Sequence, residues 1–115
     1  MNDEVLNPVD IETAIRRCAD RVHEGVKVTT DRERIAREAD RLYDRAYAHA
    51  YLAAEGPAHE KKYRAELATA AERDARDVAE VAFRHAERTA RAVEAELRAW
   101  QSVGASIRTM YGAQR

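Results

Sequence analysis

Residues 93–115 read VEAELRAWQSVGASIRTMYGAQR, and this stretch decides which fold the chain is expected to adopt. Its larger apolar residues recur alternately four and three positions apart, the heptad spacing of a helix that packs along a partner helix. After Glu96, the charged side chains are all basic. The spacing predicts an interface with a second copy or another protein, formed by Val93, Leu97, Trp100, Gly104, Ile107 and Tyr111.

The composition of the whole chain agrees with long helices. Hydrophobic residues make up 45% of the 115 residues, but alanine supplies nearly half of them, and aromatic residues make up only 6% of the chain. Charged residues make up 36%, and there are only 4 Gly and 2 Pro. This profile is typical of long helices or a coiled coil. A thick globular core is not expected, because each alanine side chain buries too little apolar area. The chain is therefore expected to be an all-α protein with one domain over residues 1–115.

Local signals predict three helices, at about residues 8–24, 31–55 and 58–111. Asn7 is a good N-cap and Pro8 suits the first helical position. Gly25 is expected to end the first helix in a left-handed conformation, and VKVTT at 26–30 to form an extended connector. Thr30 and Glu33 form a capping-box pattern that restarts the chain as a helix. Gly56-Pro57 marks the turn before the third helix.

The apolar stripes then suggest how the helices pair. In the second helix the stripe is Ile35, Ala39, Leu42, Ala46, Ala50 and Ala53. In the third it begins in steps of 4-4-3 and becomes a heptad: Leu67, Ala71, Ala75, Val78, Ala82, Ala86, Ala90 and then the residues from Val93 on. The second helix is long enough to fold back on only the first half of the third. The predicted fold is an antiparallel helical hairpin or coiled coil with a short N-terminal and a long C-terminal helix. The C-terminal end of the third helix would have no cover within the chain, and copies are expected to associate through it into an oligomeric bundle.

Catalytic and metal-binding patterns are absent from the sequence. There is no glycine-rich phosphate loop, nucleophile elbow or H-E-x-x-H motif. The carboxylates at 72, 80, 87 and 94 each stand four residues before an arginine, which predicts ordinary exposed helix pairs such as Glu72/Arg76. The four histidines form no complete ligand set, and Cys18, the one cysteine, falls on an apolar helix face as a buried thiol. We therefore expect no enzymatic activity, cofactor or metal.

Nucleic-acid binding is weakly supported. The formal net charge is −1, whereas dedicated nucleic-acid binders usually carry a basic excess. The tyrosine ladder at 43, 47 and 51 and the arginine ladder at 37, 41 and 45 point about 200° apart on one helix, so one face cannot present both. The better candidate contacts are Arg98, Arg108 and Arg115.

The cellular location is predicted from the absence of signal-peptide and membrane-spanning patterns. The N-terminal residues are acidic and lack the apolar region of a signal peptide, and no apolar run approaches the roughly 20 residues that span a bilayer. The polar helix faces mix both signs, which disfavours a membrane surface. The expected location is the cytoplasm.

Two stretches resemble a known group of proteins. They are AYLAAEGPAHEKKYRAELAT at 50–69 and AVEAELRAWQSVGASIRTMY at 92–111. The A-E-G-P turn, the A-x-L-A-T segment and L-x-A-x-Q-S resemble small helical proteins of actinobacterial phages and prophages, over roughly residues 9–111. The resemblance implies a phage or prophage protein in the bacterial cytoplasm, encoded near recombination and replication genes, and carries over no active-site residues.

Together these features predict a non-enzymatic, self-associating adaptor, accessory to DNA recombination or replication. Two alternatives stay open: direct binding of single-stranded DNA by the basic C-terminal end, and a structural or assembly role in the virion.

Overall fold

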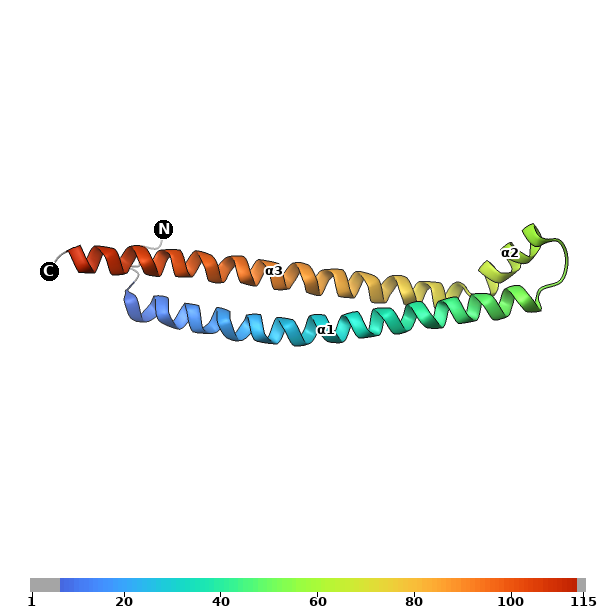
Figure 1. Cartoon of the computed structure of the whole chain (residues 1–115), viewed down its shortest axis with the longest axis horizontal. Helices are drawn as coiled ribbons and strands as arrows, with labels where there is room; N and C mark the ends of the chain where they lie inside the picture. The colour runs from blue at the N-terminus through green and yellow to red at the C-terminus, as the bar shows by residue number, and fades with distance from the viewer. Residues whose placement is uncertain (1–6, 114–115) are drawn as a thin grey trace. The chain divides into compact units, whose positions relative to one another are not determined.

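The computed structural model describes residues 7–113, which form three α-helices and no strands (Figure 1). Helix α1 covers Pro8–Ala53, α2 covers Ala58–Ala68 and α3 covers Ala70–Ala113. The all-α fold class is confirmed. No helix in this part of the chain has an apolar stretch long enough to cross a membrane.

Helix α1 begins as predicted. The backbone N–H of Asp10 donates a hydrogen bond to Oδ1 of Asn7 (3.0 Å), so Asn7 is the N-cap and Pro8 the first helical residue. Asp10 also places a negative charge in the first turn. Capping and the helix dipole therefore fix this end from local sequence alone.

The predicted break at Gly25 is wrong. Residues 8–24, the VKVTT connector and residues 31–53 form one helix, so Thr30 and Glu33 cap nothing. A glycine inside a helix costs about 1 kcal/mol relative to alanine. Here the missing side chain permits close packing, since a Cβ at Gly25 would lie 3.7 Å from the Cβ of Ala90. One turn later, the hydroxyl of Thr29 donates a long hydrogen bond to the carbonyl of Ala86 (3.5 Å). Packing against α3 therefore keeps this segment helical.

The turn at Gly56-Pro57 is confirmed, but the single helix predicted over 58–111 is wrong. Gly56 has φ 104°, which only glycine adopts at little cost. Helix α2 ends at Thr69, whose hydroxyl donates to the carbonyl of Ala65 (2.7 Å). Both residues are buried, and such side-chain bonds to the preceding turn bend helices. Helix α3 then continues without interruption through Gly104.

The helices form two compact units. The described part of unit 1 comprises residues 7–27 of the α1 region and 87–113 of α3, and unit 2 comprises residues 28–86. In unit 1, contacts at Ile11–Gly104 and Arg21–Glu96 place the two segments antiparallel. In unit 2, contacts at Thr29–Ala86 and Tyr43–Arg76 do the same.

Candidate interaction surfaces

The predicted C-terminal interface lies in unit 1, where α1 covers much of it. Val93 and Gly104 are buried, Leu97, Trp100 and Ile107 are half-buried, and Tyr111 is exposed. The helix lengths predicted from sequence pair the first helix with the region around residues 83–97 and leave the end of the third helix, with Trp100, Ile107 and Tyr111, without cover. Residues 8–27 lie along this line instead, so the premise that it projects uncovered is wrong.

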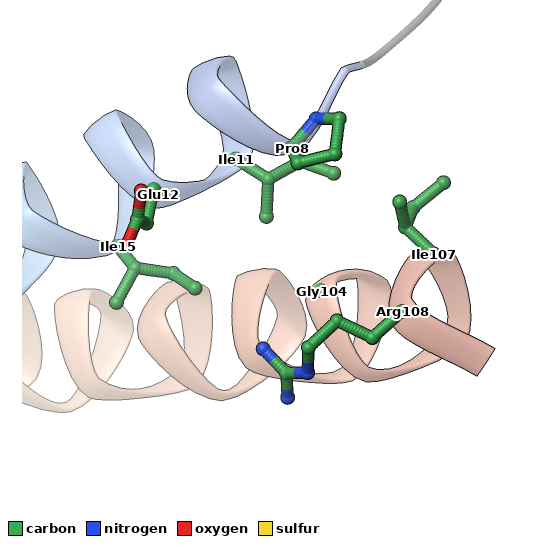
Figure 2. A pocket seen from close by; sticks show the side chains of 7 residues that line it. All are labelled: Pro8, Ile11, Glu12, Ile15, Gly104, Ile107 and Arg108. Carbon is green, nitrogen blue, oxygen red and sulfur yellow. The ribbon is translucent and has the colours of Figure 1, made fainter. Parts of the chain in front are cut away.

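Gly104 is where the two helices of unit 1 approach closely. A Cβ on Gly104 would lie 3.3 Å from Cγ2 of Ile11 and 3.6 Å from Cδ1 of Ile15. A shallow pocket of about 250 Å³ lies around this contact (Figure 2). Its lining is Pro8, Ile11, Glu12, Ile15, Gly104, Ile107 and Arg108. With one carboxylate and one guanidinium in an otherwise apolar wall, it holds no arrangement of catalytic groups.

The candidate nucleic-acid contacts do not form a strong basic surface. Arg98 and Arg108 are exposed on α3, about 15 Å apart along the helix at 1.5 Å per residue. Arg115 lies outside the described residues. Each phosphate contact adds only a modest, salt-dependent contribution, so two separated arginines support weak binding.

No group of three or more His, Cys, Asp or Glu side chains in the described part of the chain is placed to hold a metal ion. Cys18 is buried, as its position on the apolar face predicted. Comparisons with protein-family models, with curated proteins and with solved structures find no match for the chain.

The core of unit 2 contains polar side chains whose helical spacing predicts a position on the surface. Glu72 and Arg76 were expected to form an exposed pair, but both are half-buried. The guanidinium of Arg76 lies over the ring of Tyr43, 4.4 Å from its centroid, and also pairs with Asp77 (3.3 Å). Oε2 of Glu72 is buried and has no hydrogen-bond partner among the described residues.

The tyrosine ladder borders this polar core. Tyr43, Tyr47 and Tyr51 are half-buried, and successive ring centroids lie 6.2 and 6.3 Å apart. Lys61 of α2 lies over the ring of Tyr51 (5.4 Å). The rings are therefore engaged by one another and by cations of the same unit, as expected for tyrosines at the edge of a core. They are not a free stacking surface for bases.

The core positions of both long helices recur every seven residues. In α3, the series 76, 83, 90, 97, 104 and the series 79, 86, 93, 100, 107 are all buried or half-buried. In α1, the series 15, 22, 29, 36, 43, 50 is buried or half-buried as well. Two flanks border this core, one on each side of the helix pair.

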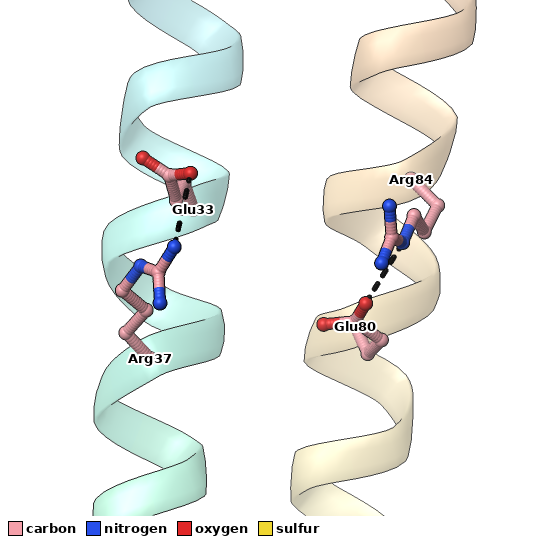
Figure 3. A network of polar contacts seen from close by, with 4 residues as sticks. All are labelled: Glu33, Arg37, Glu80 and Arg84. Carbon is pink, nitrogen blue, oxygen red and sulfur yellow. Dashed lines mark hydrogen bonds and ion pairs between the residues drawn. The ribbon is translucent and has the colours of Figure 1, made fainter.

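The first flank of unit 2 is charged. Glu33 pairs with Arg37 on α1 (3.6 Å) and Glu80 pairs with Arg84 on α3 (2.9 Å), each over four residues (Figure 3). Such exposed pairs contribute only tenths of a kcal/mol, but they keep this flank hydrated. We refer to these four residues as the charged flank.

The second flank of unit 2 is apolar and is the feature that sequence analysis missed. Residues one position before the core series 15–50 of α1 lie on the same side of the antiparallel pair as residues one position before the series 76–104 of α3. The Arg21–Glu96 ion pair (2.9 Å) illustrates this in unit 1, because Arg21 precedes Val22 and Glu96 precedes Leu97. The equivalent positions in unit 2 carry no charge. This apolar flank consists of Val28, Ile35 and Leu42 on α1 and of Ala75 and Ala82 on α3. It also includes Val78, which precedes the other core series of α3 but lies on the same side of the helix, further from the core.

The larger side chains of the apolar flank are exposed. Val28 and Ile35 are 40% and 39% exposed, Leu42 is 52% exposed and Val78 71%. The sequence contained the signal, because Ile35, Leu42, Ala75, Val78 and Ala82 belong to the predicted stripes. Those stripes were interpreted as the internal core.

Proposed function

We propose that the protein is a non-enzymatic, self-associating helical interaction protein. Its two long helices would form an antiparallel coiled-coil hairpin, and copies of this hairpin would assemble into a bundle. The antiparallel contacts and the seven-residue core spacing support the coiled coil. No single site on the described residues gathers a nucleophile, a base and a cleft, so we do not propose catalysis.

The observation that carries self-association is the apolar flank of unit 2. Its side chains lie in rows on two neighbouring helix segments, and the four larger ones are 39–71% exposed. An extended apolar surface of this kind on a soluble protein marks an interaction site. The predicted C-terminal line is a weaker candidate, because residues 8–27 already cover most of it.

The cellular role follows the resemblance to phage and prophage proteins. We propose that the oligomer acts in the cytoplasm of the bacterial host as an accessory or adaptor for recombination or replication proteins. Direct binding of single-stranded DNA and a role in virion assembly are the alternatives. Removing the gene from the phage or prophage and measuring recombination frequency, DNA yield and particle assembly separately distinguishes these three roles.

Self-association is tested on the purified full-length chain. Multi-angle light scattering over roughly 1–100 μM should give a mass at least twice that of the 13.0 kDa chain at the upper end. The double variant Ile35→Lys/Leu42→Lys should be monomeric while its circular dichroism stays helical. A wild-type protein that remains a monomer at every concentration would contradict the proposal.

A further inference from the structure

We infer that the apolar flank of unit 2 is covered by the same flank of a second copy, with α1 of each copy against α3 of the other. This inference rests on the proposed self-association and specifies its surface and geometry. The resulting four-helix arrangement has a twofold axis parallel to the helices, so every neighbouring pair of helices runs antiparallel.

The two rows of the flank complement each other in size. The α1 row carries the large side chains Val28, Ile35 and Leu42, whereas in the α3 row only Val78 is large and the small Ala75 and Ala82 stand on either side of it. In a twofold interface of this kind, the α1 row of each copy lies against the α3 row of the other copy. Large residues then pack onto small ones, which lets the helices approach closely, as interdigitating layers require.

The area of the flank suits a second copy. The antiparallel part of unit 2 pairs residues 70–86 of α3 with α1, which gives a face roughly 25 Å long at 1.5 Å per residue and about 20 Å wide for two helices. Two such faces together cover on the order of 1,000 Å², about the minimum area of a biological protein–protein interface. The charged flank cannot serve in the same way, because burying Glu33, Arg37, Glu80 and Arg84 would require desolvating all four charges.

Disulfide crosslinking between two different single-cysteine variants tests the geometry. In a Cys18→Ser background, Leu42→Cys protein is mixed with Ala75→Cys protein and oxidised mildly. Because each chain carries one cysteine, a bond between positions 42 and 75 can form only between copies. We expect the mixture to give at least tenfold more heterodimer than the matched mixture of Arg37→Cys and Glu80→Cys on the charged flank.

Three results would overturn the inference. If wild type is an oligomer by light scattering but the 42/75 mixture crosslinks no better than the charged-flank mixture, self-association stands and this interface is wrong. Stronger crosslinking through the charged flank also refutes it. If wild type is a monomer at all concentrations, both the inference and the proposed function fail, and the flank is a surface for a different protein.

Discussion

Replacing Leu42 by alanine is expected to weaken self-association about tenfold to hundredfold. Leu42 is 52% exposed in the single chain, and fully burying a leucine side chain is worth about 1.5–3 kcal/mol. Covering its exposed half therefore contributes about 1 kcal/mol per copy, and a twofold dimer covers two such side chains. The loss of about 1.5–3 kcal/mol per dimer corresponds to that change in Kd.

Sedimentation equilibrium over a dilution series measures this Kd directly. The buried half of Leu42 also stabilises unit 2, so the comparison is made at a temperature where circular dichroism shows full helicity for both proteins. Leu67→Ala is the matched control, because Leu67 is 81% exposed on α2 and lies outside the apolar flank. If Leu42→Ala keeps the wild-type Kd, or if Leu67→Ala weakens association equally, the flank does not carry the interface.

Three further changes test other parts of the structure. Gly25→Ala should raise the free energy of unfolding by about 0.5–1 kcal/mol in a urea titration, since the residue is mid-helix and its new Cβ would make an ordinary 3.7 Å contact; a loss of stability would instead indicate a left-handed glycine. Trp100→Ala should lower the free energy of unfolding by about 1–3 kcal/mol in the same titration, because the half-buried ring packs within unit 1. The mass of the oligomer should stay unchanged. A shift to monomer would restore the C-terminal line as the interface. Any binding of a single-stranded oligonucleotide should depend on salt with a slope no steeper than about −2, because Arg98 and Arg108 supply two phosphate contacts, and Arg98→Ala/Arg108→Ala should flatten it. A slope near −5 that survives this double substitution would reveal a basic surface elsewhere.

Helix ends that depend on local chemistry were predictable from sequence. The side chain of Asn7 caps α1, and Pro8 follows it, so both signals act within one turn. Gly56 supplies a positive φ angle that few other residues adopt, and Pro57 cannot sit inside the preceding helix. In each case the deciding interaction spans no more than four residues.

Helix continuity was not predictable in the same way. Gly25 has the local preference of a helix end, but the contact that keeps it helical comes from Ala90, 65 positions later. Thr69 carries no strong breaking signal, yet it is the C-terminal cap of α2, and its hydroxyl donates to the carbonyl of Ala65 in a buried environment. At Gly25, tertiary packing overrides a local preference of about 1 kcal/mol, whereas α2 ends at Thr69 without a sequence signal that marks a helix end.

Apolar periodicity located the apolar surfaces correctly but not the residues that cover them. In α3, the predicted stripe passes through Val78 and Ala82 before it joins the buried series at Ala86. Steps of 4-4-3 followed by a heptad produce this drift around the helix. The stripe is therefore exposed from Leu67 to Val78 and buried or half-buried from Ala82 to Ile107, a difference that one helix in isolation does not reveal.

The distribution of polar residues in unit 2 supports the proposed covering of the apolar flank by a second copy. A chain that had to stabilise only its own helix pair would gain by placing apolar residues at 72 and 76 and charged ones at 75 and 78. The opposite is found: Glu72 and Arg76 are half-buried in the pair, whereas Val78 is exposed on the flank. Exchanging this pattern, with Arg76→Leu and Val78→Arg in one chain, should therefore stabilise the monomer and weaken the oligomer. Urea unfolding and light scattering measure the two effects separately, and a variant that remains oligomeric would contradict the assignment of Val78 to the interface.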